Sequence, residues 1–270
     1  MIRIAIAGAA GRMGKQLIQA IVYSKVLMLT VALVRKGSGL VGNDAGKLAG
    51  IDQLHVIVSD DLYTSISDFD ILIDFTTPQA TLVNLELCRQ HKKSIVIGTT
   101  NFNQQERKII EKAAKDIAII YAANFSIGVN LMLQLLEKTT KVMGIYSDIE
   151  IIETHHRHKV DAPSGTALAM GEVITQTLSS DLQNYTIYSH SNQKRKLGTI
   201  KFTSIRTGDV IGEHTVLFTN ISEQIKITHK TTQRITFAHG AVKAAIWLKK
   251  NHKLCGLFNM NDVLGNKFLE

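Results

Sequence analysis

The chain has 270 residues, a length that fits one large domain or two medium-sized ones. Hydrophobic residues make up 45% of it and charged residues 20%, and 19 glycines stand against 2 prolines, which excludes a disordered or proline-rich chain. The sequence has no apolar run of the roughly 20 residues that cross a bilayer. Cys88 and Cys255 lack the spacing of a disulfide framework, and the first residues lack a signal-peptide pattern, so we expect a cytoplasmic protein.

The chain is basic, with a net charge of +8 that by itself would suit a nucleic-acid partner. Its 31 lysines and arginines are spread along the sequence, however, and no basic segment is interleaved with aromatic residues. An enzyme that binds anionic small molecules would carry the same excess. We therefore predict no nucleic-acid partner.

The first 125 residues alternate between short apolar runs and segments with helical periodicity. Expected strands lie at residues 2–7, 27–34, 71–75, 94–98 and 117–121. Expected helices lie at residues 15–24, 79–91 and 104–115. Strands that alternate with helices of this length predict βαβ units and a parallel sheet of the Rossmann type.

The pattern changes after Ala122. Helices are expected at residues 129–143 and 165–178, and strands at residues 148–156, 199–206, 214–219 and 224–228. A last helix, at residues 241–249, returns to the first domain. The chain is therefore predicted to be an α/β protein, with a Rossmann domain over residues 1–126 and 237–270 and a second α+β domain, built on an open mixed sheet, over residues 127–236.

A glycine loop follows the first expected strand. Gly8, Gly11 and Gly14 have GxxGxxG spacing, a variant of the GxGxxG pattern, and lie between a strand and a helix. Glycine permits the tight turn and the close approach of a dinucleotide pyrophosphate, and the helix start supplies N–H groups to the phosphates. The loop predicts a dinucleotide site; the alternative is a glycine-rich turn without a ligand.

The second expected strand ends at Val34, Arg35 and Lys36, where an NAD-binding unit usually carries a carboxylate for the ribose 2′-hydroxyl. A 2′-phosphate would be attracted by Arg35, with help from Lys36. This predicts NADPH in preference to NADH. The alternative is a solvated Arg-Lys pair at a strand end.

A cationic segment follows the strand at residues 148–156. Three histidines, an arginine and a lysine lie within residues 155–159, and a Pro-Ser-Gly turn then leads into a helix. Cations at a sheet edge suit an anionic substrate, Gly165 and Thr166 at the helix start suit a carboxylate, and histidine and lysine can transfer protons.

Three other interpretations of this segment compete. Zinc binding by His155, His156 and His158 is disfavoured because adjacent side chains on a strand point to opposite faces. Ser164 lacks the GxSxG setting of a hydrolase nucleophile. The third interpretation is a solvated basic loop without chemistry.

Several motifs resemble the 4-hydroxy-tetrahydrodipicolinate reductase family, in order along nearly the whole chain. The most specific is EIIETHHRHKVDAPSGTALAMGE at residues 150–172. The others are GAAGRMG at residues 8–14, DFT at 74–76, GTT at 98–100, AANFS at 122–126 and GDVIGEH at 208–214.

The resemblance implies a two-domain enzyme, a homotetramer assembled through the second domain's sheet, which uses NAD(P)H to reduce a small cyclic dicarboxylate with loss of water. It assigns proton transfer to His155 and Lys159, substrate binding to His156, Gly165 and Thr166, and no metal. The cofactor residues that it implies, with Arg35 from the strand end, are Gly8, Ala9, Ala10, Gly11, Arg12, Met13, Arg35, Gly98, Thr99, Thr100, Ala122, Ala123, Asn124 and Phe125. Cofactor and substrate sites are expected to face one cleft.

Two departures from the family pattern bear on the cofactor. Val34 replaces the acidic residue that commonly precedes the arginine, which agrees with a preference for NADPH. Asn101 replaces the last glycine of GTTG, and asparagine can adopt the positive φ that this position requires. Two other functions stay open: another Rossmann oxidoreductase, such as a semialdehyde dehydrogenase with a catalytic cysteine, or an NADP-binding sensor protein.

Overall fold

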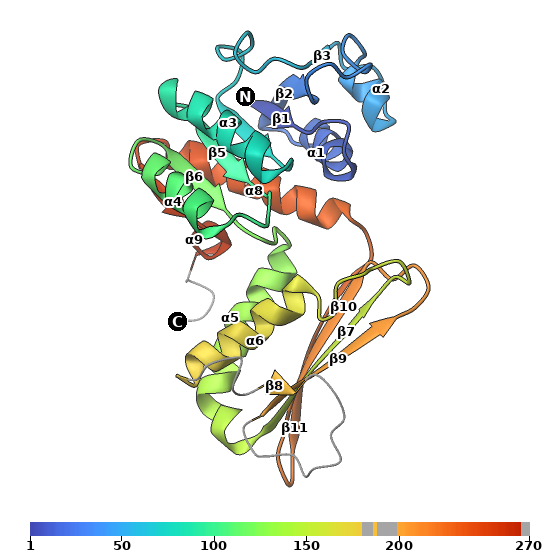
Figure 1. Cartoon of the computed structure of the whole chain (residues 1–270). Coiled ribbons are helices and arrows are strands. Elements are labelled where there is room, and N and C mark those ends of the chain that lie inside the picture. Colours follow the sequence, from blue (N-terminus) through green and yellow to red (C-terminus); the bar gives the residue numbers. More distant parts are fainter. Residues whose placement is uncertain (180–185, 188–198, 266–270) are drawn as a thin grey trace. The chain divides into compact units, whose positions relative to one another are not determined.

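The structure is a computed structural model that describes residues 1–179, 186–187 and 199–265 (Figure 1). Its internal contacts divide the chain into two compact units. Unit 1 contains residues 1–127 and 234–270, and unit 2 contains residues 128–233. Both ends of the chain thus belong to unit 1.

Unit 1 is built on a seven-stranded sheet in the order β12-β6-β5-β4-β1-β2-β3, in which every pairing is parallel. Its strands are β1 (Ile2–Ala7), β2 (Leu27–Leu33), β3 (Val58–Ser59), β4 (Ile71–Asp74), β5 (Ser94–Ile97), β6 (Ala118–Tyr121) and β12 (Gly256–Phe258). From β1 the chain proceeds to β2 and β3 on one side and to β4, β5 and β6 on the other. The carboxyl edge beside β1 is therefore where a doubly wound sheet binds ligands.

Helices cover both faces of this sheet (Figure 1). Ile4 and Ile6 of β1 face one helical layer and Ala5 and Ala7 face the other, as the alternation of a strand requires. The first layer contains α1 (Arg12–Val22), α2 (Ala45–Ala49), α8 (Ile235–Lys250) and α9 (Met260–Leu264). The second contains α3 (Pro78–Gln90) and α4 (Gln104–Ala113).

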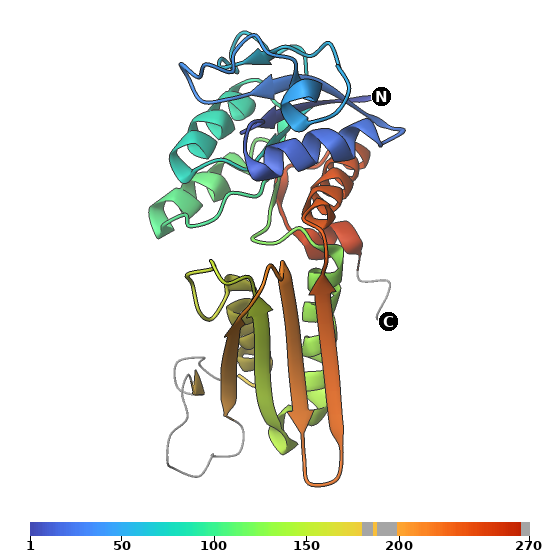
Figure 2. The same ribbon diagram turned by 90° about the vertical axis from the view of Figure 1, so that its right-hand side faces the viewer.

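Unit 2 is an open, mixed sheet of five strands in the order β11-β10-β7-β9-β8. β10 is antiparallel to β7 and β11, whereas β9 is parallel to β7 and β8. Two helices pack on one face around Leu136, Ile149, Ile151 and Val216, and Figure 2 shows the strands in front of them. The elements are α5 (Ile127–Met143), the short 3-10 helix η1 (Gly144–Tyr146), β7 (Asp148–His155), α6 (Gly165–Thr177), β8 (Thr186–Ile187), β9 (Ile200–Arg206), β10 (Gly212–Thr219) and β11 (Gln224–Thr231).

The structure confirms the predicted fold class and corrects several boundaries. Helix α1 starts at Arg12, inside the predicted glycine loop, and α8 starts at Ile235 rather than at residue 241. Strands β3 and β12 and helices α2 and α9 were not predicted, because two to five residues are too few to show a periodicity. In the described part of the chain, no helix combines the length and apolarity needed to cross a membrane.

Candidate functional site

The glycine loop has the backbone geometry that a phosphate requires. Gly8 has a φ of +80°, and a Cβ added at Gly14 would lie 2.1 Å from the carbonyl oxygen of Gly8. The N–H of Gly11 donates to the same carbonyl at 2.9 Å, which closes the loop against the start of α1. Gly11 caps that helix without a side-chain hydrogen bond, so the helix start can receive an anion.

A cavity of about 760 Å³ opens beside this loop, at the carboxyl edge of the sheet. This volume is in the range of ligand pockets. Gly8, Ala10, Gly11 and Arg35 line it, as predicted for cofactor residues. Its other lining residues are Ala7, Leu33, Val34, Lys36, Ser38, Leu40, Asp60, Asp61, Leu62, Phe75, Thr76, Thr77, Ala80, Val83, Asn84 and Leu87.

Both signs of charge meet at one part of the cavity wall. Arg35 and Lys36 line it together with Asp60 and Asp61. The carboxylate of Asp60 accepts a hydrogen bond from the N–H of Gly37 at 2.8 Å and so holds the turn that follows the two cations. Asp60 could not be selected from the sequence, because no motif around it indicates that its carboxylate reaches the turn after β2.

The other predicted cofactor loops follow β5 and β6. Among the described residues that line the cavity, none comes from residues 98–100 or 122–125. A Cβ added at Gly98 would lie 2.2 Å from the ring of Phe75, so this glycine allows Phe75 to lie across the loop. Asn101 has a φ of 66°, which confirms the prediction that asparagine replaces the family's glycine in a left-handed conformation.

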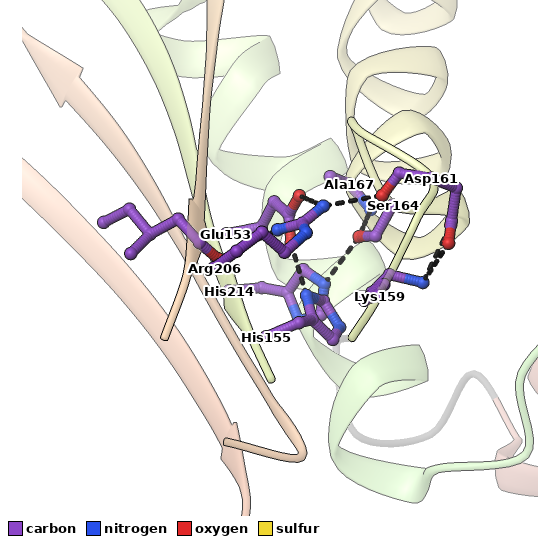
Figure 3. Close-up of polar contacts among 9 residues, drawn as sticks. Glu153, His155, Lys159, Asp161, Ser164, Ala167, Arg206 and His214 are labelled. Atoms are coloured by element: carbon purple, nitrogen blue, oxygen red, sulfur yellow. Dashed lines mark hydrogen bonds and ion pairs between the residues drawn. The ribbon is translucent and has the colours of Figure 1, made fainter. Parts of the chain in front are cut away.

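In unit 2, His155, one of the two predicted proton-transfer residues, is the last residue of β7 (Figure 3). Side chains alternate along this strand, so that Glu153 and His155 are buried whereas His156 is half-buried. His155 Nδ1 is hydrogen-bonded to the carboxylate of Glu153. The other oxygen of Glu153 accepts from Arg206 Nη2 at 2.6 Å, across the pairing of β7 with β9.

This arrangement fixes the orientation of the His155 ring. Burial raises the pKa of Glu153, but hydrogen bonds from His155 and Arg206 outweigh it and lower the pKa to about 2. Glu153 is therefore a carboxylate at neutral pH, and His155 Nδ1 must donate its proton to it. Nε2 is left as the nitrogen that can exchange a proton with a ligand.

His214 connects β10 to the start of α6. Its ring packs edge-on against His155, with 5.1 Å between ring centroids, and its Nε2 lies 3.1 Å from Ser164 Oγ. Ser164 caps α6, because its Oγ also accepts from the N–H of Ala167 at 3.2 Å. Burial above all, with a smaller electrostatic effect of the neighbouring His155, lowers the pKa of His214 to about 4, so the ring is neutral at pH 7.

Replacing His214 with glutamine is expected to flatten the pH dependence of stability. The pKa of His214 falls from 6.5 to about 4 on folding, so between these values only the unfolded chain binds the proton. Stability is full above pH 6.5 and decreases by about 3 kcal/mol as the pH falls to 4. Urea unfolding at pH 7 and pH 5 measures the slope; an unchanged slope in His214→Gln would contradict the assignment. Exposed His252→Gln serves as the control.

The remaining predicted residues lie in the loop after β7 and at the start of α6. Lys159 Nζ donates to both carboxylate oxygens of Asp161 at 2.7 Å, and this hydrogen bond lowers the pKa of Asp161. The positive charge of Lys159 is also a minor cause of the lowered pKa of His214. Gly165 and Thr166 form the first turn of α6.

A metal ion could in principle be held by a different group from the one weighed from the sequence. Among the described residues, Glu153, His155 and His214 have donor atoms that all lie within 4.8 Å of one another. Arg206 already occupies one oxygen of Glu153, so a divalent cation would stand beside a guanidinium with only one carboxylate to balance both charges. The arrangement suits proton transfer better than metal binding.

Neither cysteine resembles a catalytic nucleophile. Cys88 is fully buried on α3, and burial raises the pKa of its thiol. Cys255 is exposed and lies just before β12, at the edge of the sheet. The geometry therefore gives no support to a semialdehyde dehydrogenase that acts through a cysteine.

Comparison with known proteins identifies the family of the chain. The family model described as dihydrodipicolinate reductase, N-terminus, matches residues 2–125, and that of the C-terminus matches residues 128–264. Among solved structures, dipicolinate-bound dihydrodipicolinate reductase from Paenisporosarcina sp. TG-14 is similar at 25% identity and a TM-score of 0.76, over 96% of this chain and 97% of that one.

More distant structures share the fold alone. An amine dehydrogenase from Mycobacterium smegmatis is 12% identical, with a TM-score of 0.63 over 91% of both chains. Aspartate semialdehyde dehydrogenase II from Vibrio cholerae is 10% identical, with a TM-score of 0.58 over 93% of this chain and 99% of that one. Since the two family models together match almost the whole sequence, the chain belongs to the dihydrodipicolinate reductase family, which acts with NAD(P)H in lysine biosynthesis.

Proposed function

We propose that this reductase prefers NADPH and that its nucleotide lies in the cavity of unit 1. The observation that carries this proposal is the pair Arg35 and Lys36 on the cavity wall, after Val34 rather than after a carboxylate. A guanidinium binds a phosphate through charge-assisted hydrogen bonds, whereas it gains little from a hydroxyl. The glycine loop and the start of α1 would receive the pyrophosphate.

The substrate would be a small dicarboxylate bound by unit 2. Dipicolinate, the ligand named for the Paenisporosarcina protein, is a compound of this kind. His156 and the N–H groups of Gly165 and Thr166 at the start of α6 would bind its carboxylates. The surrounding arginine, lysine and histidines would attract its negative charges.

NADPH held by the glycine loop, Arg35 and Lys36 would supply the hydride that reduces a ring carbon of the substrate. The protein must supply the proton that balances the reaction, and the substrate's hydroxyl leaves as water. Lys159 is the proposed donor, and His155 would give or accept a proton at Nε2 because Glu153 holds its Nδ1. Glu153 and Arg206 are positioning residues in this mechanism.

A homotetramer formed through the sheet of unit 2, located in the cytoplasm, completes the proposal. Among the residues that the structure describes, helices cover one face only of the five-stranded sheet, and a second copy could cover its other face. Sedimentation analysis of the purified protein tests this assembly; a monomer at micromolar concentration would reject it.

Purified protein should oxidise NADPH, followed at 340 nm, when dihydrodipicolinate synthase supplies the substrate. An NADP-binding sensor would bind the nucleotide but leave the absorbance constant. Another Rossmann oxidoreductase would act on a different carbonyl or imine compound and not on this one. The assay therefore separates the reductase from both alternatives.

The cofactor preference can be reversed in two steps. Arg35→Ala is expected to weaken NADPH binding by about 10- to 100-fold, the value of a charged hydrogen bond, and to change NADH binding little. Val34→Glu should add affinity for NADH by accepting from the ribose 2′-hydroxyl. KM values for both cofactors measure the effect, with NADH as the internal control. Equal losses for both cofactors in Arg35→Ala would contradict the proposed contact.

A further inference from the structure

A fully buried carboxylate ends β4, at the edge of the sheet where the cavity opens. Asp74 is 0% exposed, and Asn84 Nδ2 donates to its Oδ2 at 2.8 Å. Its Oδ1 accepts from the N–H of Thr76 at 3.0 Å, from Thr76 Oγ1 at 2.6 Å, from Thr81 Oγ1 at 3.0 Å and from Thr99 Oγ1 at 3.4 Å. Every partner donates a hydrogen bond, as a carboxylate requires.

These partners come from three separate segments. Thr76 lies in the turn after β4, Thr81 and Asn84 lie on α3, and Thr99 lies in the loop after β5. The partners also contact one another, since the N–H of Thr76 donates to Thr99 Oγ1 at 3.0 Å and the hydroxyl oxygens of Thr81 and Thr99 lie 2.8 Å apart. Asp74 thus joins two loops and a helix through one network.

Such a carboxylate is costly for the fold. Burial raises the pKa of Asp74 despite the hydrogen bonds from Asn84, Thr76 and Thr81. No ion pair to Asp74 occurs among the described residues, so no cation offsets the cost. An apolar residue at the end of the strand would avoid the free-energy cost of burying a charge. The presence of a carboxylate therefore indicates that the loops it holds require it.

Part of the cavity wall is formed by residues that Asp74 holds and by the residue that follows it in the chain. Phe75, Thr76 and Asn84 line the cavity, and the ring of Phe75 lies over Gly98 in the same loop as Thr99. Phe75 also contacts Phe125, with 5.4 Å between ring centroids. A change at Asp74 would therefore move both the wall of the cavity and the predicted cofactor loop at residues 98–100.

We propose that Asp74 is a positioning residue for the nucleotide cofactor, which holds the loops after β4 and β5 in the shape that receives it. The inference rests on the proposed nucleotide site in unit 1. Asp74 itself is buried and would not touch the cofactor; it acts through Phe75, Thr76 and Thr99.

Asp74→Asn tests the proposal. The NH₂ group of the asparagine would face the NH₂ group of Asn84, so that two donors would meet and the hydrogen bond would be lost. NADPH affinity, measured by calorimetry, is expected to fall about tenfold or more, the effect of losing a charged hydrogen bond. Dipicolinate affinity, measured in the same way, should stay within about twofold. Asp70→Asn is the matched control, since Asp70 precedes the same strand and binds Arg3 at its opposite end.

Two further variants keep the test decisive if Asp74→Asn folds poorly. Thr81→Val removes a buried hydroxyl that bonds both Asp74 and Thr99, without touching the cavity, and should also weaken NADPH binding. Asp74→Asn combined with Asn84→Asp restores the donor–acceptor pair in reverse and should recover part of the affinity.

The proposal is overturned if folded Asp74→Asn and Thr81→Val bind NADPH within about twofold of the wild type. It is also overturned if Asp70→Asn loses as much affinity, or if dipicolinate binding falls equally, because either result would show a general loss of stability. Wild-type protein that binds NADPH but fails to turn over the substrate would reject the reductase function and leave this comparison of affinities intact.

Discussion

Lys159→Ala is expected to lower kcat by about 10²- to 10⁴-fold, the usual contribution of a general acid. Lys159 lies in the loop after β7, where its Nζ pairs with Asp161 and its side chain is 21% exposed. Removing it would leave the leaving hydroxyl or the reduced ring without its proton donor. Steady-state turnover with saturating NADPH and substrate measures the loss.

Two control variants distinguish the loss of a proton donor from the loss of a positive charge. Lys159→Arg keeps the positive charge but cannot release a proton near neutral pH, so substrate KM should be retained while kcat falls. Lys230→Ala removes a lysine of the same unit that pairs with Glu213 and is 61% exposed, and should leave kcat unchanged. Turnover of Lys159→Ala within about twofold of the wild type would remove this residue from the mechanism.

Glu153→Ala should be the most destabilising of the proposed changes, at about 3–5 kcal/mol, because it leaves the charge of Arg206 without its partner. Glu153 is 1% exposed and binds both His155 and Arg206. Urea unfolding of unit 2, followed by circular dichroism, measures the loss. Glu213→Ala, which breaks an exposed ion pair with Lys230, should cost less than about 1 kcal/mol.

Glu153→Gln distinguishes the chemical role from the structural one. A glutamine can still accept from Arg206, but its NH₂ group would face His155 Nδ1 and favour the tautomer that carries its proton on Nε2. We expect kcat to fall at least about tenfold while the fold is kept, as for other histidines held in the wrong tautomer. Unchanged turnover in Glu153→Gln would show that the Glu153–His155 pair only stabilises the sheet.

Acid should reduce the stabilisation that Glu153 provides through His155 and Arg206, and it should do so in a definite pH range. The pKa of Glu153 is lowered from 4.5 to about 2, so its contribution is complete above pH 4.5 and is lost as the pH falls from 4.5 toward 2. The loss at His214 occurs at higher pH, between 6.5 and 4. Two buried neighbours thus account for two ranges of acid sensitivity, which overlap only between pH 4.5 and pH 4.

The architecture could be predicted where an element is long enough to show its period. The helix over residues 235–250 illustrates the limit, since Gly240 lies inside it although glycine disfavours helices. A Cβ at Gly240 would lie 1.7 Å from the carbonyl oxygen of Phe125, so the glycine permits a close approach that only the folded chain reveals. Tertiary packing here outweighs local preference.

The candidate site, like the fold, could be predicted from the sequence only in part. His155 and Lys159 could be selected because their types and spacing lie within one short segment. Arg206 was not selected, and His214 was noticed only as the end of the GDVIGEH motif. Both reach β7 only through its pairing with β9 and β10, and the register of a sheet cannot be obtained from one sequence. Asp74 was noticed as part of a motif, yet its partners on α3 and after β5 become visible only in the structure.

The division of unit 1 into two chain segments has a consequence during protein synthesis. Residues 1–127 leave the ribosome long before α8, which covers one face of the sheet, and before β12, which completes its edge. Unit 2 is continuous and can fold as soon as it has emerged. We expect nascent chains that stop near residue 233 to expose the apolar face of the first sheet and to need chaperones until the last segment arrives.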